Sequence, residues 1–232
     1  MLGLLIILLL SAVFLRFFYK KTLSVLGLRP TTDRLMDVAF TGVMAGLICA
    51  VYHFMDIVFI DNHWELNSSY SLASLATGGW WVLKSVLFEE FVFRGALLYI
   101  LIRCLGDKWA CLISAAAFGI YHWFSYQLWG DAFQLTLVFF MTGLFGWVLA
   151  YAFAKLKSMY LPIAVHFGWN FLHIVIFSSG PLGPQLLMKA NNSALKGTLS
   201  LLVFLFQVFA LPLATFFYVR YRQKEKCPAQ RM

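Results

Sequence analysis

Long apolar runs separated by short polar stretches dominate the chain. A helix needs roughly 20 apolar residues to cross a hydrocarbon core of about 30 Å. Seven runs approach that length, near residues 1–18, 36–60, 80–102, 109–128, 132–154, 159–178 and 198–219. The runs are continuous and do not alternate as the strands of a membrane barrel do, so they predict helices, which satisfy their own backbone in lipid. We therefore expect an all-α, polytopic transmembrane helix bundle with about seven spanning helices.

The composition supports a membrane location. Hydrophobic residues make up 62% of the 232 positions and charged residues only 12%, whereas soluble domains are about 25% charged. This excludes an ordinary soluble domain. No internal repeat, low-complexity tract or long linker divides the chain. We expect one integral-membrane domain, residues 1–232, in a bacterial cytoplasmic (inner) membrane.

The basic residues predict an orientation for the bundle. Lys and Arg gather in short cytoplasmic connections. Most of the 18 lie in alternate connections, after the first, third and fifth runs, and in the tail that includes Arg231. This pattern predicts the N-terminus outside and the C-terminus inside. Topology and anionic headgroups explain the net charge of +8, so we expect membrane lipid as a partner and no nucleic acid.

Three ionisable residues interrupt the third apolar run. Each would cost roughly 2.5–3.5 kcal/mol at mid-bilayer if it were isolated. Glu90 and Arg94 are four residues apart, which places them on one helical face as a supporting ion pair. Glu89 points about 100° away from Glu90 around the helix and needs other partners. The sequence therefore predicts that Glu89 meets polar side chains from other helices.

Polar residues at a similar predicted depth lie in two later runs. They are His122 in the fourth run and His166 and Asn170 in the sixth, and His173 of the sixth run is a further candidate partner. His166 and Asn170 are four apart and face the same way, with Gly168 between them allowing a close approach. We expect Glu89, His122, His166 and Asn170 to converge. His173 has no motif role and is interpreted as structural.

Three short motifs carry a resemblance to a known family. "EEFVFRG" holds Glu89, Glu90 and Arg94, "FGIYH" holds Phe118 and His122, and "HFGWN" holds His166 and Asn170. In this order they resemble the EExxxR, FxxxH and HxxxN/B motifs of the CAAX-protease and bacteriocin-processing (CPBP, or Abi) family. These are intramembrane proteases related to the type II CAAX prenyl endopeptidase. The matching region, 80–178, would hold the catalytic helices.

The resemblance implies an intramembrane endopeptidase that cuts a peptide or protein substrate, lipidated or membrane-anchored. Glu89 would activate the hydrolytic water, His122 would hold that water or assist proton transfer, and His166 with Asn170 would stabilise the oxyanion. General physical chemistry allows these roles, because a buried carboxylate can act as a general base and preorganised donors stabilise an oxyanion. The motifs contain no nucleophilic Ser or Cys, and GxSxG is absent, which argues against a serine mechanism.

The sequence allows both a zinc-dependent and a metal-free mechanism. Glu89, His122 and His166 form a two-His, one-carboxylate set of the kind that catalytic zinc uses. However, HExxH is absent, and relatives in the family are understood to work as glutamate proteases without metal. We expect no cofactor, with zinc as the alternative. A non-catalytic membrane scaffold or immunity protein and a proton-coupled transporter remain as other classes, because intramembrane charges also mark ion paths.

The remaining Cys and His residues suggest no site from sequence alone. The cysteines, Cys49, Cys104, Cys111 and Cys227, show no CxxC spacing and support neither a disulfide framework nor a thiolate metal site. We interpret them as small core or interfacial residues. His53 and His63 fall near the outer end of the second run and are expected at the interface.

Overall fold

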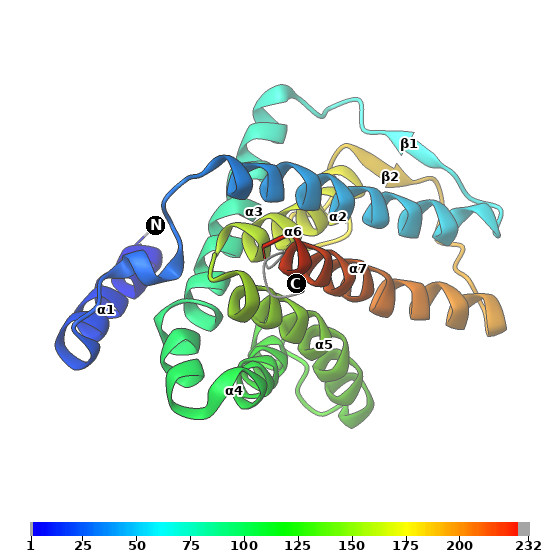
Figure 1. Ribbon diagram of the computed structural model, residues 1–232. Coiled ribbons are helices and arrows are strands. Elements are labelled where there is room, and N and C mark those ends of the chain that lie inside the picture. The colour runs from blue at the N-terminus through cyan, green and yellow to red at the C-terminus, as the bar shows by residue number, and fades with distance from the viewer. Residues whose placement is uncertain (1, 227–232) are drawn as a thin grey trace.

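The computed structural model describes residues 2–226 and confirms the all-α class (Figure 1). Met1 and residues 227–232, which include Cys227 and the basic Arg231, lie outside the described range. The α-helices are α1 (Leu2–Tyr19), α2 (Thr32–Val58), α3 (Leu72–Phe93), α4 (Ala96–Ser125), α5 (Ala132–Leu156), α6 (Tyr160–Asn170) and α7 (Gly197–Lys226). Four short elements complete the order: a 3-10 turn η1 (Leu23–Leu26), a π-helix η2 (Phe171–Ile176), and strands β1 (Trp64–Leu66) and β2 (Leu187–Lys189).

Four of the helices, α1, α2, α5 and α7, are long and apolar enough to cross a membrane. The segment Tyr160–Ile176, formed by α6 and η2, is apolar but shorter. The other three α-helices of the described residues are α3, α4 and α6, and they carry the three motifs. Polar side chains and breaks in these helices explain why they do not qualify as long apolar spans. Four of the seven expected spans are therefore supported, and the orientation stays a prediction.

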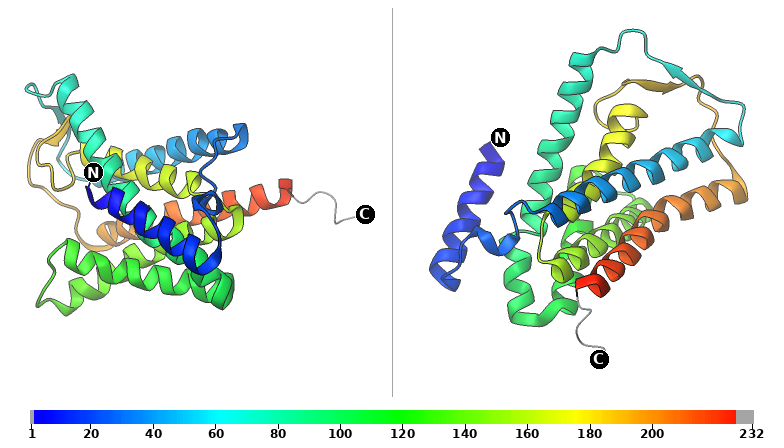
Figure 2. Two further views of the ribbon diagram at one scale, coloured as in Figure 1. Left: turned by 90° about the vertical axis from the view of Figure 1, so that its left-hand side faces the viewer. Right: turned by 45° about the horizontal axis from the view of Figure 1, so that its top comes forward.

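The helices pack around α5 and α6. α4 lies along α5, α2 lies along α6, and α7 contacts both α5 and α2. α1 lies to one side, against α3 and α4 (Figures 1 and 2), and buries only Ser11 and Leu15. The bundle core is thus made by α2 to α7, with α1 at its margin.

The contact between α2 and α6 depends on glycine. A Cβ on Gly168 would lie 2.3 Å from the carbonyl oxygen of Gly42, a distance that real side chains do not tolerate. The close approach that Gly168 was expected to allow is therefore made by a neighbouring helix. This contact fixes α6 against α2 on the turn between His166 and Asn170.

The expected helix over 80–102 is wrong in its boundaries. α3 begins earlier, at Leu72, and ends at Phe93, and α4 begins at Ala96. Arg94 caps α3, with φ −120° and ψ 2°. A Cβ at Gly95 would lie 2.2 Å from the carbonyl oxygen of Phe91, so the chain breaks where glycine permits it. A second break, at Gly106 with φ 77°, lies inside α4, close to the connection expected between the third and fourth runs.

The sixth run also divides. The expected helix over 159–178 is α-helical to Asn170 and then continues as the π-helix η2, which carries His173. π-helical turns are rare and often mark functional sites. His166 and His173 therefore lie on differently wound parts of one continuous segment.

Polar contacts close the bundle at both ends. At one end β1 and β2 pair antiparallel, with Trp64 opposite Lys189, and Lys189 forms an ion pair with Asp56 of α2. At the other end Arg222 of α7 contacts Asp37 of α2 through Nε at 2.8 Å. Asp37 is 3% exposed, an acidic group inside the second run that the sequence interpretation had not singled out.

Candidate active site

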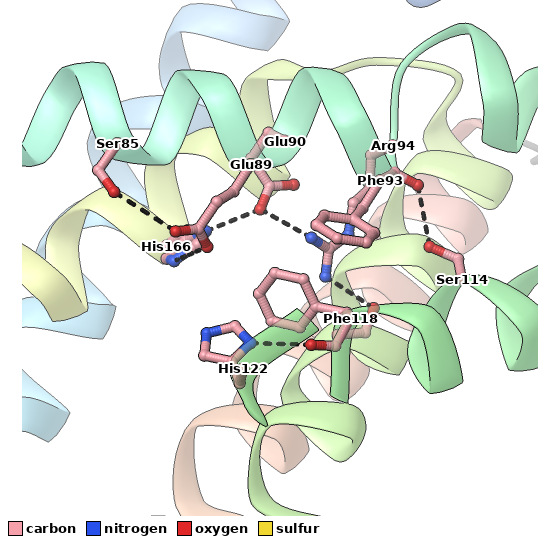
Figure 3. Close-up of polar contacts among 10 residues, drawn as sticks. Ser85, Glu89, Glu90, Phe93, Arg94, Ser114, Phe118, His122 and His166 are labelled. Carbon is pink, nitrogen blue, oxygen red and sulfur yellow. Dashed lines mark hydrogen bonds and ion pairs between the residues drawn. The ribbon is translucent and has the colours of Figure 1, made fainter. Parts of the chain in front are cut away.

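The expected pair of Glu90 and Arg94 is present and fully buried. Arg94 Nη1 donates to Glu90 Oε1 at 3.1 Å, and both side chains are 0% exposed (Figure 3). Arg94 Nη2 donates to the carbonyl of Gly146 on α5 at 3.1 Å, and the guanidinium lies 4.1 Å from the ring centroid of Phe118. A buried charge needs such compensation. The pair therefore joins α3 to α4 and α5.

Glu90 also holds His166. His166 Nδ1 donates to the same Glu90 oxygen, Oε1, at 2.7 Å (Figure 3). Because a carboxylate only accepts, the hydrogen of this bond is on Nδ1. The opposite nitrogen, Nε2, is 3.8 Å from Glu89 Oε2. The sequence predicted that Glu90 pairs with Arg94, but it did not predict that Glu90 would also orient an imidazole toward the second glutamate.

Glu89 is buried but only partly partnered. It is 8% exposed, and its Oε1 accepts a bond from Ser85 Oγ at 3.4 Å. Its Oε2 has no hydrogen-bond partner among the described residues. The 3.8 Å to His166 Nε2 is too long for a direct hydrogen bond, and it is a separation that one water can bridge. Ser85 is four residues before Glu89, and that spacing could have identified it.

His122 is oriented from its own helix. Its Nδ1 donates to the Phe118 carbonyl at 2.8 Å (Figure 3), which in the neutral ring leaves Nε2 as the acceptor. Its ring lies 4.5 Å from that of Phe118, edge to face. Phe118 thus contacts the Arg94 guanidinium and the His122 imidazole together. The FxxxH spacing places these two residues one turn apart.

A cavity of about 500 Å³ connects the candidate residues. Glu89, His122, His166 and Asn170 all line it, and α7 contributes part of the wall through Gln207 and Pro212. His173 lines the same cavity. The structure therefore brings the four expected residues to one space between α3, α4 and α6, within the size range of small-molecule and peptide sites.

The buried charges of this cluster are unevenly compensated. Glu90 contacts both the Arg94 guanidinium and the His166 imidazole. Glu89 has only the longer approach of 3.8 Å to His166 Nε2. Glu89 is therefore the carboxylate with the weaker compensation, which burial makes costly.

The geometry does not favour zinc on the expected set. Within the described residues, Glu89, His122 and His166 do not bring one ligand atom each to within 4.8 Å of one another, whereas another trio of side chains does. The Nδ1 atoms of His166 and His122 are bound to protein acceptors, which leaves each Nε2 available, so only the spacing of the three side chains disfavours zinc here.

The fold and the cavity define a class: an all-α membrane protein with a carboxylate and two imidazoles at one buried cavity. The family model described as type II CAAX prenyl endopeptidase Rce1-like matches residues 71–172, which begin one residue before α3 and end within η2. This segment therefore matches the family that the three motifs indicated. Comparison with curated proteins and with solved structures gave no match. At this level the match supports a CAAX-type protease of the membrane.

Proposed function

We propose that the chain is an intramembrane endopeptidase that hydrolyses a peptide bond of a membrane-associated substrate, with Glu89 as general base. The observation that carries the proposal is the geometry of Glu89: its unpartnered Oε2 lies 3.8 Å from His166 Nε2, on a cavity that His122 and Asn170 also line. A carboxylate kept without a direct partner at such a position is costly. That cost is reasonable where the oxygen must take up a proton.

In the proposed reaction, Glu89 accepts a proton as the water oxygen bonds to the scissile carbonyl carbon. His122, with Nε2 as acceptor, holds the same water. The carbonyl oxygen becomes an oxyanion, which receives hydrogen bonds from the Asn170 amide and from His166 Nε2. The C–N bond then breaks as Glu89 returns its proton to the leaving amine. No covalent enzyme intermediate and no metal is needed.

Glu90 and Arg94 position His166 in this scheme. Glu90 accepts a hydrogen bond from His166 Nδ1. This bond fixes the ring so that Nε2 faces the cavity, and in the proposed reaction Nε2 carries the N–H that donates to the oxyanion. Arg94 balances the charge of Glu90. Donors of this kind are worth about 3–4 kcal/mol each in other hydrolases. Glu90 is therefore a positioning residue, with a role beyond that of an ion-pair partner.

The test compares cells that carry the wild type, Glu89→Gln, or the control Glu65→Gln. Glu65 is an exposed residue of β1, so its variant changes charge equally without touching the cavity. Quantitative analysis of protein N- and C-termini should show processed ends in the wild type and in Glu65→Gln that are missing in Glu89→Gln. Identical termini in all three strains would refute the protease, and loss of solute transport alone would favour a transporter.

A further inference from the structure

A second polar cluster lies in the same bundle, outside the proposed reaction. Cys49 and His53 come from α2 and His173 from η2, and one ligand atom of each lies within 4.8 Å of the others. Cys49 is 0% and His53 2% exposed. The expectation that His53 lies at the interface is therefore wrong, whereas Cys49 is a core residue as expected. Cys49 and His53 are four residues apart, which places both on one face of α2.

The two imidazoles are hydrogen-bonded to each other and pack against aromatic rings. His53 Nε2 and His173 Nδ1 are 3.0 Å apart, and His53 Nδ1 is buried without a hydrogen-bond partner in the described part of the chain. Phe177 stacks on His53 with 4.3 Å between ring centroids. The nearest acidic residue along α2, Asp56, is bound to Lys189. No described carboxylate is within ion-pairing distance of either ring, in contrast to His166.

We propose that Cys49, His53 and His173 bind a Zn²⁺ ion. One thiolate and two imidazoles are a ligand set that zinc accepts, with a fourth position left open. Tetrahedral zinc at Zn–N and Zn–S lengths of about 2.0 and 2.3 Å holds its ligands roughly 3.3–3.5 Å apart. The two imidazole nitrogens, 3.0 Å apart, are within a few tenths of an ångström of that separation. The Cys49 sulfur lies within 4.8 Å of one nitrogen of each ring, and binding would draw it closer.

The charge balance also fits. Binding replaces the thiol proton of Cys49, which leaves as H⁺, and uses one lone pair of each neutral imidazole. The ion and thiolate together carry a single positive charge. His53 is five residues from the end of α2, roughly 7–8 Å along the axis, so this charge would lie toward the end of the bundle. His173 lines the cavity, which leaves space for a fourth ligand from outside the chain.

The ion would act as a clamp. It would join α2 to the segment that directly follows Asn170, and so fix the π-helical turn that ends the HxxxN helix. This is a positioning role, because neither Cys49 nor His53 lines the cavity of the proposed reaction. The site is independent of the proposed function and holds for a scaffold or a transporter as well.

The test measures metal binding on the purified full chain in detergent, with Zn²⁺ alone as the probe. We expect one tightly bound Zn²⁺ per wild-type chain, lost in Cys49→Ser and in His53→Ala and retained in Glu89→Gln. Cys111→Ala is the matched control, since Cys111 is also a buried free thiol outside the trio. With Co²⁺, the wild type and Cys111→Ala should show thiolate charge-transfer absorption, and Cys49→Ser should not.

Thermal unfolding gives a readout that does not depend on the variants folding. At free Zn²⁺ about 100-fold above Kd, the wild-type Tm should rise by roughly 5–10 °C, and Mg²⁺, which prefers oxygen ligands, should not raise it. Zinc binding that is absent from the wild type, or that is equal in Cys49→Ser, would overturn the proposal. Binding lost in Glu89→Gln but kept in Cys49→Ser would move the ion to the other cluster.

Discussion

His166 and His173 lie seven residues apart on one continuous segment, yet their surroundings differ in kind. His166 is bound to a carboxylate that is itself paired with a buried guanidinium, so its cluster is built from opposite charges. His173 lies beside another imidazole and a thiol, and its cluster contains no carboxylate, guanidinium or ammonium group. The comparison teaches that the partners decide the chemistry: the first set suits proton transfer and anion stabilisation, and the second suits a borderline-soft cation.

The largest expected effect is the loss of cleavage in Glu89→Gln, a change that should affect the first cluster and not the second. Glu89→Gln keeps the shape of the side chain but removes the base, so the cleavage rate should fall by about 10²–10⁴-fold. Zinc binding should not change, because Glu89 does not belong to the second cluster. Rates would be measured on a substrate found from the terminal analysis. Wild-type cleavage by Glu89→Gln would end the assignment of this residue as the base.

The second effect is on stability and concerns the buried charges of the first cluster. Arg94→Met leaves Glu90 without its cation, which should lower the free energy of unfolding by about 3–5 kcal/mol. Glu90→Gln added to Arg94→Met should recover part of the loss. Arg103→Met, at an exposed position of α4, is the control and should change little. Denaturation in detergent measures all four proteins, and equal losses for Arg94→Met and Arg103→Met would contradict the buried pair.

A third change should disturb both clusters together. Gly168 lies between His166 and His173, where α6 contacts Gly42 of α2, and an alanine there would overlap backbone. We expect Gly168→Ala to cost about 1–3 kcal/mol, as overpacking typically does. Gly143→Ala on α5, whose new Cβ would meet only Ala115 O at 3.6 Å, should be close to neutral. Similar Tm values for the two variants would show that α2 and α6 can separate without cost.

Much of the first cluster could be predicted from the sequence because its members obey local spacing rules. Glu90 and Arg94, Phe118 and His122, and His166 and Asn170 each lie four apart, and apolar runs place them within helices. What spacing cannot give is the choice of partner between helices. The shared oxygen of Glu90, held by Arg94 and His166, depends on how α3 and α6 pack.

The fold was predictable to a similar degree. Continuous apolar runs predicted helices close to those observed, but the break after Phe93 was missed because Gly95 lies in an otherwise apolar stretch. The second cluster was missed for a different reason. Cys49 and His53 are 120 or more residues from His173 in sequence, and only the packing of α2 against η2 brings them together.

The smallest expected effect sharpens the comparison most, because it concerns the metal. If zinc clamps α2 to η2 without entering the reaction, a chelator should slow cleavage by only about fivefold, the factor that roughly 1 kcal/mol gives. In Cys49→Ser, which has already lost the ion, the chelator should change nothing further. Chelator sensitivity by itself would therefore not identify a metalloprotease. If chelation instead abolished cleavage in both proteins, the ion would have to lie on Glu89, His122 and His166, and the glutamate mechanism would be wrong.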